Sequence, residues 1–265
     1  MAIFRYELRQ LRNNTLWWAL SVALAIFMFL PAYISMLTSG AVDAASVMNN
    51  DFFEMLGVDA NIINTPIGTY GYLTSFFAIA AGINGMFLGL KTFTKETIGK
   101  TAEFTYTKPY GRGHVFCAKL SAATVSALVV GASYFVASAL SAHMGAAAGG
   151  IDFKPLALIA LTFTLIEIFF VLFGACAGAI YSKIRTPLLA SSGVVFMFYV
   201  LSAYASKVRL DAVKYLTPFS YFGASKIVSS GGYNAGYMAA FLTLCVAFAA
   251  TGFGVFNRKD ISFIS

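Results

Sequence analysis

The sequence predicts an all-α membrane protein with six transmembrane helices, and three observations support this fold class. Six apolar stretches each approach or exceed the roughly 20 residues that an α-helix needs to cross a bilayer. Hydrophobic residues make up 59% of the chain and charged residues 11%, whereas soluble domains average about 25% charged residues. Almost every charge lies outside the stretches, which cover approximately residues 16–37, 70–90, 115–141, 156–181, 188–206 and 235–256.

The composition argues against a soluble helical protein, because a chain this apolar would expose large sticky patches to water. The first apolar stretch is too long for the hydrophobic region of a signal peptide, and no small-residue cleavage site follows it. We therefore interpret residues 16–37 as a retained signal-anchor helix.

The N-terminal arm, residues 1–15, is predicted to form an interfacial helix that lies along the membrane. At helical spacing its apolar and basic side chains occupy neighbouring faces, which suits a helix between acyl chains and anionic headgroups. A plain basic arm that only orients the protein is the alternative. The residues concerned are Phe4, Leu8, Leu11, Arg5, Arg9 and Arg12.

The distribution of Lys and Arg predicts that both termini lie in the cytoplasm. Most basic residues fall in the N-terminal arm, the second and fourth connections and the C-terminal tail, whereas residues 38–69 contain acidic residues and no basic one. Cytoplasmic loops carry the excess of positive charge in membrane proteins. The fifth connection is placed outside by helix count, since it holds Lys207, Arg209, Lys214 and Lys226.

The longer outer connections are expected to hold short helices. Residues 38–69 contain an apolar run, around Phe52 and Phe53, that suggests an amphipathic helix. In residues 206–234, aromatic side chains surround Pro218, which predicts short segments that re-enter the interface under protein cover.

Glu167 is the acidic residue placed deep in a predicted span. A buried carboxylate costs several kcal/mol unless it is paired, protonated or hydrated. Two interpretations stay open: a contact in the pathway for a proton, cation or substrate, or a hydrogen-bonded packing residue between helices.

The second connection, residues 91–114, differs from the others in composition. From Lys91 through Leu120 the chain reads KTFTKETIGKTAEFTYTKPYGRGHVFCAKL, which mixes charged residues with aromatic ones and a Pro-Tyr-Gly turn. A solvated loop has no need of Phe104 or Tyr106, so we predict a short helix that docks a soluble partner on the cytoplasmic side.

This segment resembles the first cytoplasmic loop of the permeases of ABC-2-type ABC transporters. The resemblance extends to the six spans, the basic N-terminal arm and the aromatic outer segment before the last span. The residues that match the loop pattern are Glu96, Gly99, Thr101, Glu103, Pro109, Arg112 and Lys119.

The resemblance implies a type V exporter-like fold in which the loop forms a coupling helix seated in a groove of an ATPase subunit. Glu96 and Glu103 would brace the helix or contact the partner. Pro109 would end it, and Arg112 would cap its C-terminal end, where a cation is favoured. Phe104 and Tyr106 would be its apolar anchors, a kind of residue that often dominates interfaces.

Nucleotide chemistry is not expected in this chain. Residues 99–101 spell Gly-Lys-Thr, as at the end of a P-loop, but the glycine that a P-loop needs five positions earlier is replaced by Thr94. ATP and Mg²⁺ are expected in the partner ATPase instead, and no cofactor in this chain.

Enzyme, metal and nucleic-acid functions are disfavoured by the sequence. The two histidines, His114 and His143, are far apart, and no paired acidic motif or nucleophile motif lies in a span. Three cysteines without a CxxC argue against a disulfide framework or a zinc site. The basic residues are dispersed rather than gathered into a stripe that would bind nucleic acid.

The function that the resemblance implies is the permease subunit of an ABC exporter, and we expect it in a bacterial plasma membrane. Its expected partners are ABC ATPase subunits, a second permease in a homodimer or heterodimer, membrane lipids and an exported substrate. An ion-coupled secondary transporter that uses Glu167 is the main alternative. A membrane scaffold without transport is a third.

Overall fold

The computed structural model describes residues 2–38, 65–99, 111–145, 152–181, 183–208 and 211–258. Over these residues the protein consists of helices and has no strand. Six of the helices are long and apolar enough to cross a membrane, which confirms the predicted fold class. They are α1 (Ala2–Thr38), α5 (Pro66–Ile98), α7 (Arg112–Gly145), α8 (Phe153–Ile180), α9 (Pro187–Lys207) and α12 (Ala235–Arg258).

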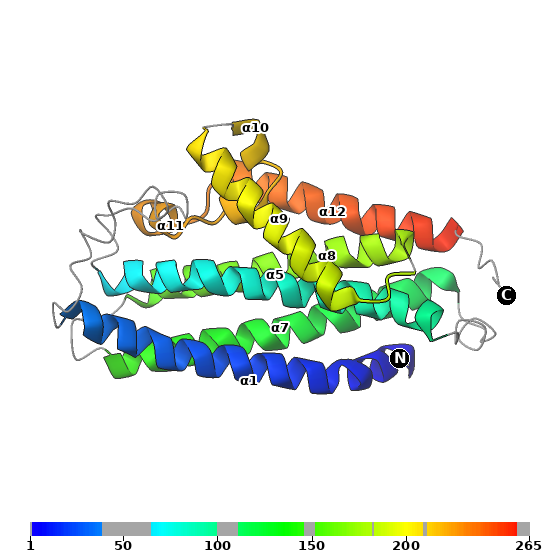
Figure 1. Cartoon of the computed structure of the whole chain (residues 1–265), viewed down its shortest axis with the longest axis horizontal. Helices are drawn as coiled ribbons and strands as arrows, with labels where there is room; N and C mark the ends of the chain where they lie inside the picture. Colours follow the sequence, from blue (N-terminus) through cyan, green and yellow to red (C-terminus); the bar gives the residue numbers. More distant parts are fainter. Residues whose placement is uncertain are drawn as a thin grey trace.

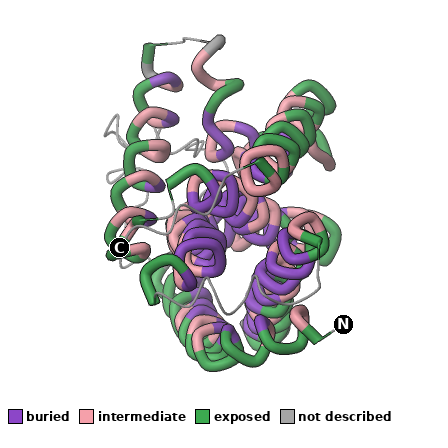
Figure 2. The backbone as a smooth tube through the Cα atoms, turned by 90° about the vertical axis from the view of Figure 1, so that its right-hand side faces the viewer, coloured by how far each residue is buried: buried purple, intermediate pink, exposed green. Residues whose placement is uncertain are grey.

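The central pair of the bundle is α5 and α8, which share the most extensive contact in the protein. The pair α1 and α7 packs along one side, α12 lies against α8, and α9 leans across α5 (Figure 1). Seen along the bundle, buried residues are concentrated in the middle and exposed residues on the periphery (Figure 2). The exposed periphery is largely apolar, as expected where lipid rather than water is the solvent.

Glycines set the distance between α5 and α8. A Cβ atom added at Gly85 would collide with the carbonyl oxygen of Glu167, and one added at Gly174 with that of Met86. The two backbones are thus in contact, which only residues without a side chain permit. In the sequence, glycines recur at helical spacing at positions 82, 85 and 89 of the second apolar stretch and at 174 and 178 of the fourth. Such spacing predicts close helix packing.

The N-terminal arm differs from the prediction, because α1 runs without a break from Ala2 to Thr38. Residues 1–15 are therefore not a helix separate from the first span. No proline or glycine occurs before Pro31, and the Thr15 hydroxyl donates to the carbonyl oxygen of Leu11 at 3.0 Å. Leu11, expected to face lipid, is 2% exposed because it packs in a cluster with residues of α5, α7 and α8.

Three short helices connect α9 to α12, namely α10 (Asp211–Lys214), η2 (Pro218–Ser220) and α11 (Ala224–Ser230). Two aromatic residues between η2 and α11 are buried, Tyr221 at 3% and Phe222 at 7% exposed, whereas Tyr215 of the same connection is 50% exposed. Burial raises the pKa of Tyr221 to about 12. Gly231 ends α11 in the left-handed conformation, with φ of 67°.

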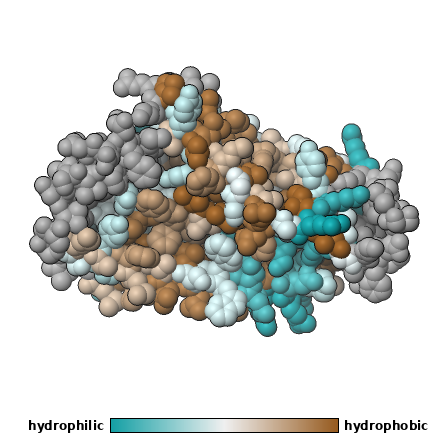
Figure 3. Space-filling view, viewed as in Figure 1, coloured by the Kyte–Doolittle hydropathy of each residue, from teal (hydrophilic) through white to brown (hydrophobic). Residues whose placement is uncertain are grey.

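The hydrophilic surface gathers toward the end of the bundle where α1 begins, and the middle is largely apolar (Figure 3). The end of α5 and the start of α7 lie at this same end (Figure 1). The amphipathic helix predicted around Phe52 lies outside the described residues.

Candidate functional site

The second connection is shorter than predicted, because helix continues into both of its ends. The expected loop at 91–114 begins only after Ile98, and α7 starts at Arg112. The helix persists because Thr92, Phe93 and Thr94, which read as loop residues, are buried against the bundle. Gly99 caps α5, and its N–H donates to the carbonyl oxygen of Lys95 at 2.8 Å.

Some predicted docking residues lie outside the described residues, so their roles stay predictions. Glu96, Gly99 and Arg112 are described, and they stand at the two ends of the connection. The others are Thr101, Glu103, Phe104, Tyr106 and Pro109.

Lys119 of α7 is the centre of a group of charges at the base of this connection. Its side chain is 1% exposed. The ammonium donates to Glu96 Oε1 at 2.8 Å and to the carbonyl oxygen of Thr92 at 2.9 Å. Glu7 Oε1 lies 3.6 Å away. A residue that reads from the sequence as a positive charge at a helix start is thus fully enclosed.

Glu7 links the same group to α1. Its side chain is also 1% exposed, and it forms an ion pair with Lys95 of α5, which in addition donates to Gln10. Glu7, Lys95, Glu96 and Lys119 together form what we call the charge cluster. It contains two cations and two anions and joins α1, α5 and α7.

The arrangement of the charge cluster suits a structural role, the holding together of helix ends, rather than a catalytic one. Charges taken out of water are tolerated only when they are paired and their remaining hydrogen-bonding positions are filled. Here each buried charge has an opposite charge within reach, so the ends of α5 and α7 keep a defined spacing. Glu96 accordingly faces Lys119 and ties the end of α5 to α7. Its predicted role toward the docking helix, to brace it or to contact the partner, stays a prediction.

Sequence reasoning missed Glu7 and the burial of Lys119. The one available signal was that Glu7 is the only acidic residue in an otherwise basic arm. Its partner Lys95 follows 88 residues later, and nothing local in the sequence indicates that the two meet.

An aromatic group joins the two helices that flank the connection to α12. The ring centroids of Phe93 and Phe116 are 5.0 Å apart, and Phe256 lies 5.7 Å from Phe93. Arg112 Nη1 donates to the carbonyl oxygen of Asn257 at 3.4 Å. The sequence predicts that Arg112 caps the docking helix; in the structure this contact places its cation at the C-terminal end of α12, where a positive charge is favoured.

Replacing Glu96 by Gln is expected to lower the free energy of unfolding by about 1.5–3 kcal/mol, the range for a hydrogen bond to a charged group. The amide keeps the shape of the carboxylate, but Lys119 loses its nearest anion. Chemical denaturation of the purified protein in detergent measures the loss. Thr97→Ser, at an exposed position of the same turn, serves as the control and should leave stability unchanged.

Glu167 has a partner that the sequence did not suggest. Asn84 Nδ2 of α5 donates to Glu167 Oε1 of α8 at 2.6 Å, and both residues are 0% exposed. Of the two interpretations left open by the sequence, this geometry favours the packing residue between helices.

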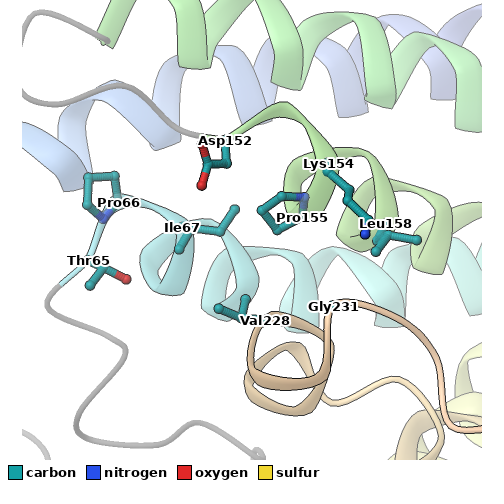
Figure 4. Close-up of a pocket in the computed structure, with 9 residues that line it drawn as sticks. All are labelled: Thr65, Pro66, Ile67, Asp152, Lys154, Pro155, Leu158, Val228 and Gly231. Carbon is teal, nitrogen blue, oxygen red and sulfur yellow. The ribbon is translucent and has the colours of Figure 1, made fainter.

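Two pockets lie away from the charge cluster. The larger, of about 360 Å³, opens between the starts of α5 and α8 and the end of α11, with the side chains of Asp152 and Lys154 at its rim (Figure 4). The smaller, of about 120 Å³, is lined by a mixture of apolar residues and residues that carry a hydroxyl group, among them Thr74, Tyr199 and Ser202. Neither pocket includes Glu167 or a member of the charge cluster.

Comparison with known families gives a result for almost the whole chain. The sequence model of one family, described as "ABC-2 family transporter protein", matches residues 1–261. No individual curated protein matches the chain. The matched range takes in all six long helices and the second connection, the features that carried the resemblance, and it also includes the charge cluster. The chain therefore belongs to the ABC-2 family of transporter proteins.

Proposed function

We propose that this permease forms the export pathway and that separate ATPase subunits, which dock on its second connection, supply the energy. Membership of the ABC-2 family makes the chain the membrane-spanning subunit of an ABC transporter. The observation that carries the finer proposal is the charge cluster, which ties the two helices flanking this connection to each other and to α1.

The charge cluster explains how a push on the connection would reach the membrane. Closure of two ATPase subunits on ATP and Mg²⁺ displaces the segment between Gly99 and Arg112. Because Lys119 joins α7 to α5, and Glu7 joins α1 to both, the three helix ends move together. The close backbone contact between α5 and α8 passes the movement on to the centre of the bundle.

The proposed assembly contains two permeases, as a homodimer or heterodimer, and two ATPase subunits in a bacterial plasma membrane. The termini and the second connection face the cytoplasm. The contacts between helix ends support a placement of the start of α1, the end of α5, the start of α7 and the end of α12 on one side of the membrane. The charge cluster joins the first three, and Arg112 contacts the last.

Ion-coupled transport through Glu167 has less support than ATP-driven export. A coupling carboxylate must exchange its ion with water at some stage, whereas Glu167 is 0% exposed and hydrogen-bonded to Asn84. Flux in proteoliposomes distinguishes the two functions: ATP-driven export requires the ATPase and ATP, and ion-coupled flux requires neither.

Glu103→Lys is expected to abolish co-purification of the ATPase, because it reverses a charge in the segment proposed to dock there. The measurement is a pull-down of a co-expressed ABC ATPase from detergent-solubilised membranes. Asp152→Lys reverses a charge at the opposite end of the bundle, where it is exposed, and should leave the pull-down intact. A Glu103→Lys protein that elutes normally in size-exclusion chromatography and still retains the ATPase would contradict the proposal.

A further inference from the structure

Asn84 and Glu167 form an isolated polar pair where α5 and α8 are closest. Asn84 Nδ2 donates to Glu167 Oε1 at 2.6 Å. Both side chains are 0% exposed. The carbonyl oxygen of Glu167 occupies the place where the neighbouring Gly85 would carry a Cβ atom. The pair is therefore enclosed between two helices whose backbones touch.

The remaining polar atoms of this pair could satisfy each other's hydrogen bonding if one of them carried a proton. Asn84 Oδ1 and Glu167 Oε2 are both buried, and neither has a hydrogen-bond partner among the described residues. A carboxamide oxygen can only accept a hydrogen bond, and an ionised carboxylate oxygen can also only accept. A protonated carboxylic acid has an O–H donor. One proton on Oε2 would thus satisfy both atoms at once.

The charge on Glu167 has no compensation of its own in the ionised form. Among the described residues it forms no ion pair, and Asn84 is its hydrogen-bond partner. An unpaired buried carboxylate is far more costly than a neutral acid, and such groups are neutralised in practice. Glu7 and Glu96 show the contrast, because each is buried beside a lysine.

We infer that Glu167 carries a proton in this conformation and that its carboxylic acid and the Asn84 carboxamide form a two-hydrogen-bond ring. Oε2–H donates to Asn84 Oδ1, and Asn84 Nδ2 donates to Oε1. The pair is a neutral clamp that holds α5 on α8 in the middle of the membrane. Glu167 is thereby a positioning residue, since it acts through α5, the helix that carries Glu96 and the start of the second connection.

Infrared difference spectroscopy of the unmodified protein against Glu167→Gln tests the proton directly, at neutral pH and without any ATPase. Loss of the carbonyl stretch of a protonated carboxylic acid, shifted in D₂O, is the expected result. Loss of carboxylate stretches instead, or of both kinds of band, would overturn the inference. Glu7→Gln is the matched control: it removes a glutamate beside a lysine and should remove carboxylate stretches alone.

Thermal unfolding in detergent tests the two-hydrogen-bond ring. Glu167→Gln should unfold at nearly the original temperature, because the amide nitrogen donates to Asn84 Oδ1 as the acid did. Glu167→Leu and Asn84→Leu should each lower the midpoint, since each leaves a buried polar partner unsatisfied. The double variant should lose less than the sum of the single losses. Strict additivity, or a Glu167→Gln protein as unstable as Glu167→Leu, would refute the clamp. Both experiments are independent of the proposed export function.

Discussion

Replacing Lys119 by Met is expected to lower the free energy of unfolding by about 3–5 kcal/mol, the loss that follows when one member of a buried ion pair is removed. The substitution keeps an unbranched apolar stem of the same length up to Cε. It removes the ammonium that lies 2.8 Å from Glu96 and 3.6 Å from Glu7. Both carboxylates are then left with less positive charge, Glu7 keeping only Lys95.

Chemical denaturation in detergent measures this effect, and Lys183→Met is the matched control. Lys183 is an exposed cation between α8 and α9, so its replacement should change the free energy of unfolding by no more than about 0.5 kcal/mol. Combining Lys119→Met with Glu96→Gln should cost less than the two changes separately, because the second removes an anion that the first has left unpaired. Equal stability of the two Met variants would show that Lys119 is not enclosed as described.

Replacing Gly85 by Ala is expected to lower the free energy of unfolding by about 3 kcal/mol, at the upper end of the range for overpacking. The added methyl group meets the carbonyl oxygen of Glu167, a backbone atom that cannot turn aside as a side chain can. The helices α5 and α8 must therefore separate along their most extensive contact. The hydrogen bond from Asn84 to Glu167 should be lost in the same step.

Gly193→Ala provides the control for this prediction, since it makes the same chemical change inside another long helix. A Cβ atom at Gly193 would meet nothing within 4 Å. Alanine has the higher helix propensity, by about 1 kcal/mol in water, so stability should stay the same or rise slightly. If Gly85→Ala lowered the unfolding temperature no more than Gly193→Ala does, the backbone contact described between α5 and α8 at Gly85 would be contradicted.

The parts of the fold that could be predicted from the sequence are those governed by local composition. Twenty or more apolar residues in succession have few alternatives to a membrane span, because backbone polar groups in lipid must bond within their own helix. Glycines at positions 82, 85 and 89 likewise indicated a close helix contact. The loop around Glu96 and Arg112 carried enough of a pattern to indicate the family, which the comparison confirmed.

The ends of the helices were harder to predict, because the identity of a polar residue does not say whether its side chain is solvated or paired with another residue inside the protein. The run from Thr92 to Glu96 reads as loop, and its burial depends on Phe116, Lys119 and Glu7, which come from elsewhere in the chain. The hydrogen bond of Asn84 could not be predicted either, because an uncharged amide in a span does not by itself indicate which residue it contacts. It lies 83 residues before Glu167.

The amino-acid sequence alone determined the class of protein, the number of membrane crossings and the region where a partner is expected to dock. These depend on hydrophobicity and length, which each segment carries by itself. Only the tertiary structure decided which charges are buried and how they are neutralised, because that depends on the distance between side chains far apart in the chain. Lys119 is a surface charge in the sequence and an enclosed one in the bundle for this reason.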